Sequence, residues 1–215
     1  MPELSFSVEG AESVPYAIAP TLGFKLRVAN ANPAETIHTV ALRCQIQIDV
    51  TRRRYTADEQ TRMRDLFGEP ERWSRTLRGF LWTHASVIVP AFQGSTLIEL
   101  PVPCTFDFNV AATKYFEGLD DGEIPLQFLF SGTVFYTDES ESLQIAPISW
   151  EQEAKYRLAV KTWREMMDTY YPNAVWLNVR RDVFDRLNAY KTQRGIPTWE
   201  QALECMLRSE EAVSR

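Results

Sequence analysis

Hydrophobic and polar residues alternate along much of the first 150 residues, which predicts a β-rich segment. The clearest example is His38–Val50, where apolar side chains at every second position form one apolar face. Leu22–Val28 alternates in the same way, and the turn residues 30–35 between the two runs predict that they form a hairpin-like pair. Shorter runs predict further strands at Leu4–Val8, His84–Val89, Thr96–Val102, Thr105–Phe108 and Ile124–Tyr136. About seven short strands of this kind predict an antiparallel β-sandwich, immunoglobulin-like or similar.

A helical period interrupts the strands at about residues 56–80. Thr56 and Glu59 have the spacing of a capping box, and Gly68 ends the apolar face that follows. Pro70 can occupy the first turn of a second short helix, and from Trp73 onward apolar residues again recur at helical spacing. We therefore expect a two-helix insertion in the sandwich.

The last third of the chain changes from strand to helix. Trp150–Leu158 alternates like a strand, although its charge spacing also suits a helix, and we favour the strand. Helical periods then continue up to Pro172, through Val183–Tyr190, and from Thr198 onward. These patterns predict an α+β protein with a sandwich at residues 1–158 and a C-terminal helical unit at 159–215. That unit packs on the sandwich or, alternatively, on a partner.

Composition, charge and the absence of targeting patterns limit the classes of protein to which the chain can belong. The chain has 215 residues, of which 45% are hydrophobic, and a net charge of −6, which excludes wholesale disorder and argues against a general nucleic-acid binder. No apolar stretch approaches the roughly 20 residues that a membrane-spanning helix needs. The N-terminus lacks the pattern of a signal peptide, and three widely separated cysteines do not form a secreted framework. The cytoplasm is the expected compartment.

Charge is segregated along the sequence. Residues 51–79 contain eight arginines and five acids, whereas residues 117–153 contain nine acids and neither lysine nor arginine. Such polarity can steer a protein partner or an anionic ligand, although charged faces that pair across the fold are the simpler interpretation. The candidate interaction surface consists of Arg52, Arg53, Arg54, Arg62, Arg72, Arg75, Arg78, Trp82 and His84.

No motif for catalysis or metal binding is present in the sequence. The CxxC, HExxH and GxSxG spacings are all absent, and so is a glycine-rich phosphate loop. His38 and Cys44 share one face of a predicted strand, but six residues of extended chain separate them by roughly 20 Å, too far for one metal ion. We therefore predict no catalytic residue, metal or cofactor, and expect that the protein is not an enzyme.

The cysteines are expected to be reduced. Cys44 and Cys104 should be buried thiols that pack in the core, whereas Cys205 lies off the apolar stripe of its helix and should be partly exposed. The alternative for the first two is a bridge like that of immunoglobulin domains. A rival function is a small-ligand-binding protein or enzyme, with a cleft between sandwich and helices that uses His84, Arg54 and Cys104.

Several stretches resemble one known family: PELSFSVEGAE, ALRCQI with RRRY, DLFGEPERW, FLWTHAS, LPVPCTFDF and IPLQFLFSGTVFY. Together they resemble an uncharacterised, mainly actinobacterial family, domain of unknown function 6084, whose genes tend to lie beside those of nickel–iron hydrogenases. The resemblance covers nearly the whole chain and carries over no catalytic residues. It implies a non-enzymatic accessory protein that assists assembly, maturation or docking of a hydrogenase complex. The implied partners are hydrogenase subunits or maturation factors, and homo-oligomerisation stays open.

A catalytic or electron-transfer role within such a complex does not fit the sequence. The chain lacks the set of cysteines and histidines that holds iron–sulfur or nickel–iron centres.

Overall fold

The alternating segments form two antiparallel sheets in a computed structural model, which describes residues 2–105, 110–137, 142–174 and 177–213. One sheet has the strand order β1 (Leu4–Ser13), β2 (Thr21–Asn30), β6 (Ser95–Pro103). The other has the order β4 (Phe80–Val89), β3 (Thr36–Ile48), β7 (Glu123–Thr137), β8 (Leu143–Pro147). In this second sheet β5 (Phe92–Gln93) also pairs with β3, and β9 (Glu153–Ala159) with β7. The predicted α+β sandwich is confirmed.

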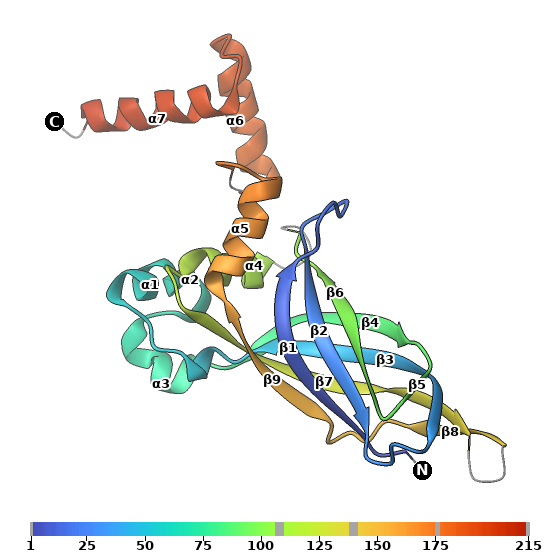
Figure 1. Cartoon of the computed structure of the whole chain (residues 1–215). Helices are drawn as coiled ribbons and strands as arrows, with labels where there is room; N and C mark the ends of the chain where they lie inside the picture. Colours follow the sequence, from blue (N-terminus) through green and yellow to red (C-terminus); the bar gives the residue numbers. More distant parts are fainter. Residues whose placement is uncertain (1, 106–109, 138–141, 175–176, 214–215) are drawn as a thin grey trace. The chain divides into compact units, whose positions relative to one another are not determined.

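The apolar faces of the two sheets pack against each other. Figure 1 shows β1, β2 and β6 lying across β3, β4 and β7. Between the sheets Phe6 stacks on Phe130 with ring centroids 4.4 Å apart, and Phe24 meets Phe128 edge-on at 5.1 Å. Burial of these alternating side chains is the main driving force for the sandwich.

The predicted hairpin of the second and third strands is wrong. β2 and β3 lie in different sheets, so residues 31–35 carry the chain across the sandwich. Asn30 at the start of this connection donates a 2.9 Å hydrogen bond to the Glu35 carboxylate. Alternation shows that each strand buries one face, but it does not show whether two such strands lie side by side or face to face.

The insertion between β3 and β4 is helical, as predicted, but it is divided into several short helical segments and not into two helices. They are η1 (Val50–Arg52), α1 (Ala57–Arg62), α2 (Arg64–Phe67), η2 (Pro70–Arg72) and α3 (Trp73–Thr76). The capping box is confirmed, since Thr56 accepts from the Glu59 backbone at 3.2 Å and Glu59 accepts from the Thr56 backbone at 2.9 Å. The helix is interrupted at Met63, between α1 and α2, and the Met63 side chain is buried in the core. Gly68 ends α2 with φ +74°.

Two further helices complete the first compact unit, which extends to Ala174. The first, α4 (Val110–Gly118), was not predicted, and it buries Tyr115 and Phe116. In the predicted strand Thr105–Phe108, residues 106–108 lie outside the described residues. The second, α5 (Val160–Tyr170), buries Trp163 in the same core, so the unit extends beyond the boundary predicted at residue 158. β9 shows that the latter part of Trp150–Leu158 is a strand, as favoured.

The second compact unit, residues 175–215, is a pair of helices. They are α6 (Arg181–Gln193) and α7 (Trp199–Val213), and Gly195 follows α6 with φ +62°. Thr198 accepts a 3.2 Å hydrogen bond from the Gln201 backbone at the start of α7, which confirms that helix start. Among the described residues, no helix has the length and apolarity needed to cross a membrane.

Candidate functional site

Arg53 is mostly covered by the fold, contrary to its predicted place on the interaction surface. Its side chain is 11% exposed and pairs at 2.6 Å with the Glu59 carboxylate, which is 2% exposed. The guanidinium also donates to the backbone carbonyls of Asp121 and Glu123. Glu59 in turn accepts a 3.0 Å hydrogen bond from the Asp120 backbone. The pair therefore fixes the insertion to the loop that precedes β7.

Trp82 is also buried, which corrects a second predicted surface residue. It is 4% exposed and packs edge-on against Phe116 with ring centroids 5.1 Å apart. A β-bulge causes this, because Ile46 pairs with Thr83 and the next residue of β3 pairs with Leu81, so that Trp82 is the extra residue. Beyond the bulge the alternation reverses, and His84 points to solvent.

A second bulge changes the position of the other histidine. The register of β3 and β7 shifts between Ile37 and Thr39, and His38 is exposed there with a hydrogen bond to Thr137. His38 and Cys44 therefore do not share a face, contrary to the prediction. Among the described residues there is no group of three or more histidine, cysteine or acidic side chains that could hold a metal ion.

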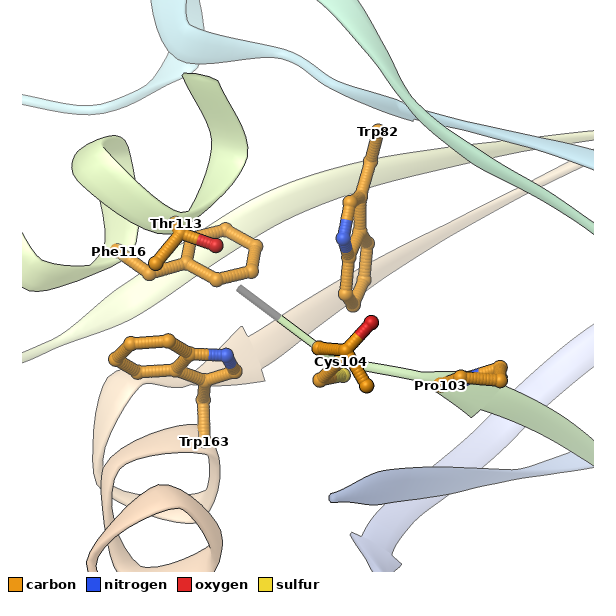
Figure 2. A pocket seen from close by; sticks show the side chains of 7 residues that line it. Trp82, Pro103, Cys104, Thr113, Phe116 and Trp163 are labelled. Carbon is orange, nitrogen blue, oxygen red and sulfur yellow. The ribbon is translucent and has the colours of Figure 1, made fainter. Parts of the chain in front are cut away.

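Figure 2 shows a small cavity that three aromatic rings surround. Its lining residues come from β4, β6, α4 and α5 and the residues after β6: Trp82, Pro103, Cys104, Thr105, Thr113, Phe116 and Trp163. The volume is about 10 Å³, which is room for one water molecule. Cys104 donates to the Val102 carbonyl at 3.3 Å, and burial raises its pKa to about 12. The thiol is therefore protonated at neutral pH and is a poor nucleophile.

The residues named for the rival function do not converge. Cys104 lines the small cavity, but neither His84 nor Arg54 does. His84 lies on the outer face of β4, and Arg54 is exposed between η1 and α1. Cys44 is buried like Cys104, Cys205 is exposed, and all three are free thiols, as expected.

The remaining predicted arginines are all exposed, but they differ in their ionic partners. Arg52 pairs with Asp49 at 2.8 Å, and Arg62 pairs with Asp120 at 2.5 Å. The second of these joins the basic segment to the acidic segment, so pairing across the fold accounts for part of the charge pattern.

Four arginines of the insertion have no such partner. In the described part of the chain, no carboxylate forms an ion pair with Arg54, Arg72, Arg75 or Arg78. Only two acids of the insertion, Asp58 and Glu71, are likewise without an ion pair there. The surface of the insertion therefore carries an excess of uncompensated positive charge, and we call Arg54, Arg72, Arg75 and Arg78 the free arginines.

A groove of about 400 Å³ lies beside the insertion, where η1 meets the outer face of β7 and β9. The groove is lined by Pro125, by the cations Arg52, Lys155 and Arg157, and by the acid Asp49, among others. Only Arg52 was predicted. Lys155 and Arg157 lie about a hundred residues later, and the pairing of β9 with β7 brings them to the same place. Alternation in β9 puts them on one face, but nothing local in the sequence indicates what lies beside that face.

Comparison with known proteins gives a family and no function. The sequence profile of the "Family of unknown function (DUF6084)" matches residues 1–215. No curated protein matches the chain.

Among solved structures, the CARDB domain of a Pyrococcus furiosus protein, crystallised in complex with di-metal ions, has a TM-score of 0.28 and 9% identity; the match covers 74% of this chain and 92% of that one. A protein described as late embryogenesis abundant (LEA) has a TM-score of 0.33 and 15% identity, with 74% and 72% covered. A Bordetella pertussis protein described as ApaA has a TM-score of 0.24 and 14% identity, with 74% of this chain and 94% of that one covered. At these TM-scores and identities, the structural similarity supports no inference about the function of this chain.

Proposed function

We propose that this chain, which belongs to the DUF6084 family, is a non-enzymatic interaction protein whose helical insertion docks on an acidic protein surface. The resemblance of its motifs favours one class of partner, a subunit or maturation factor of a nickel–iron hydrogenase. In that role the protein assists assembly, maturation or docking of the complex and supplies no redox centre of its own.

The observation that carries the proposal is the set of free arginines. Exposed guanidinium groups without a carboxylate partner attract an acidic surface over several ångströms and raise the rate of encounter. Arginine is also enriched in protein interfaces, because its planar fork bonds carboxylates bidentately. The cations of the groove beside the insertion do not add to this excess, because Arg52, Lys155 and Arg157 pair with Asp49, Glu153 and Glu123.

The support of the insertion fits such a role. The free arginines lie on short 3₁₀ and α segments and their flanks, which by themselves are too short to be stable. The buried pair of Arg53 and Glu59 and the capping box at Thr56 fix the start of the insertion, and Trp73 is buried in the core further along. The charged side chains therefore project from a supported backbone, so a partner need not order a loop when it binds.

The polar groups of the described residues favour binding over catalysis. The thiols of Cys44 and Cys104 are buried, and burial raises the pKa of each to about 12. His38 and His84 are exposed on different strands of the second sheet. No pair of these groups has the geometry of a nucleophile beside its base.

A salt-controlled capture experiment tests the proposal. The tagged chain is used at low ionic strength to capture proteins from its native host, and the recovered proteins are identified by mass spectrometry. Hydrogenase subunits or maturation factors should be enriched, and their binding, measured with the purified partner, should weaken steeply as salt rises. Recovery of the chain alone, or of proteins unrelated to hydrogenase, contradicts the proposal.

Charge reversal locates the surface. Arg72→Glu/Arg75→Glu should lower the affinity for the purified partner by at least about tenfold, since two favourable charges become repulsive. The matched control Arg43→Glu/Lys161→Glu changes the net charge equally, at exposed positions on β3 and α5. An equal loss in both variants shows that only net charge matters, and an unchanged affinity in the first excludes the insertion.

A further inference from the structure

The C-terminal pair of helices leaves apolar side chains exposed. Among its described side chains, residues 177–209, only Ala202 is buried. Leu203 and Leu207, one turn apart on α7, are 40% and 62% exposed. Phe184 of α6 packs on Trp199 of α7 with ring centroids 5.3 Å apart, yet both remain exposed. These side chains form a stripe that continues from one helix to the other.

Two helices of this length do not enclose a core. Chains below about 40 residues usually need a metal, disulfides or oligomerisation to be stable. The described residues of this unit provide no metal cluster, and its one cysteine is free. Another surface must therefore cover the apolar stripe.

The charges of the two helices indicate what that surface is. Residues 180–194, which contain α6, have five basic and two acidic side chains. Residues 199–213, which form α7, have four acidic and one basic side chain. The pair thus presents a basic helix beside an acidic one. A partner helix of a single charge would attract one of them and repel the other.

We propose that the stripe is covered by the same stripe of a second copy, so that two helix pairs form a four-helix bundle with two-fold symmetry. In such a bundle the two α6 helices lie on one diagonal and the two α7 helices on the other. Each α6 then has an α7 of its own chain on one side and an α7 of the second copy on the other. Every adjacent pair joins a basic helix to an acidic one, while the apolar stripes meet inside.

The exposed cysteine allows a direct test with the full chain. Cys205 is exposed, whereas Cys44 and Cys104 are buried, so a thiol-reactive dye should label α7 selectively. Donor-labelled and acceptor-labelled protein are mixed, and energy transfer between copies is measured together with the mass in solution. Energy transfer and a mass of twice 24.8 kDa are expected at micromolar concentration. A single-chain mass without energy transfer overturns the proposal.

Substitutions in the stripe locate the interface. Leu203→Asp/Leu207→Asp should abolish the energy transfer, because it places four carboxylates in the interior of the bundle. The control Ile88→Asp/Leu143→Asp changes two apolar residues of the first unit that are 66% and 65% exposed, and it should leave the energy transfer intact. The helical interface is contradicted if Leu203→Asp/Leu207→Asp still forms a dimer. It is also contradicted if only the control variant dissociates.

Charge exchange tests the arrangement itself and does not depend on how well either variant folds alone. Arg181→Glu/Arg186→Glu makes α6 acidic, and Glu200→Lys/Glu204→Lys makes α7 basic. Each variant should fail to pair with itself, because every adjacent pair of helices now has like charges. In a mixture of the two, the helices within each chain still have like charges, but both contacts between the copies join an acidic helix to a basic one, so energy transfer should return in part. Failure of the mixture overturns the proposed arrangement. Because the docking experiment uses other residues, this inference can fail while the proposed function stands.

Discussion

Removal of Arg53 should destabilise the first unit more than removal of any other arginine of the insertion. In Arg53→Met the Glu59 carboxylate, 2% exposed, loses its counter-charge and keeps only its hydrogen bonds to the Thr56 and Asp120 backbones. Breaking a buried ion pair from one side costs about 3–5 kcal/mol of unfolding free energy. Among the described residues the Arg53 Nε is a buried donor without an acceptor, which reduces the net gain from the pair. We therefore expect about 3 kcal/mol.

A double-mutant cycle separates the pair from its surroundings. Glu59→Gln should cost about 1–3 kcal/mol, since Arg53 keeps the carbonyls of Asp121 and Glu123 as acceptors. In Arg53→Met/Glu59→Gln both charges are gone, so the combined loss should be smaller than the sum of the two by at least about 1 kcal/mol.

Urea unfolding followed by tryptophan fluorescence measures each value, with the neighbouring Arg52→Met as the control. Arg52 is 58% exposed in its pair with Asp49, and the expected cost is below about 1 kcal/mol. A loss below about 1 kcal/mol for Arg53→Met, or additive effects of the two single changes, would refute the view that this pair is desolvated and fixes the insertion.

Three further predictions rest on other parts of the fold. Gly132→Ala should destabilise the protein by more than about 3 kcal/mol in urea unfolding, since φ is +144° and a Cβ would lie 2.1 Å from the Ala41 carbonyl oxygen; Gly68→Ala, at φ +74° in open space, should cost only about 1–2 kcal/mol. Thiol labelling of the native protein should modify Cys205 first and reach the other two cysteines only after unfolding; equal rates for all three would contradict their burial. Burial raises the pKa of Tyr55 to about 12 from its usual value of about 10, so stability that is full below pH 10 should fall by up to about 1.4 kcal/mol per pH unit from this group as pH rises toward 12. Tyr55→Phe should lose less stability between pH 10 and pH 12 than the unchanged protein, which checks that Tyr55 causes this loss.

The strands could be predicted from the sequence because burial of one face imposes a period of two. Where the period is regular, as in β3 between Thr39 and Ile46, prediction and structure agree residue by residue. The prediction fails at the bulges, where one extra residue reverses the alternation. Trp82 and His84 are two residues apart, so regular alternation would put them on the same face, yet Trp82 is buried and His84 is exposed. A bulge depends on the register with the neighbouring strand, and that register is not visible in a single strand.

Contacts between distant segments account for the other errors. α4 was missed because its apolar residues do not form a stripe long enough to outweigh a strand or a loop, and it is stabilised where Phe116 packs between Trp82 and Trp163. The extent of the first unit was underestimated for the same reason, because Trp163 of α5 completes this aromatic cluster. Local periodicity identifies helices, but the partners of a helix decide to which compact unit it belongs.

The candidate site shows the same limit at the level of single charges. Arg52 ends the 3₁₀ helix η1, and Arg53 and Arg54 follow it, so the regular alternation of a strand does not describe these three arginines. The sequence does not reveal that the middle arginine meets a buried carboxylate, because Glu59 has to satisfy a capping box and an ion pair at once. Once that carboxylate is used, the other acids of the insertion are too few to neutralise its remaining arginines. The excess of arginines over acids in the insertion is therefore the same whichever arginine pairs with Glu59. Arg53→Glu/Glu59→Arg, which exchanges the two charges without changing the net charge, should leave partner affinity intact wherever it leaves the fold intact.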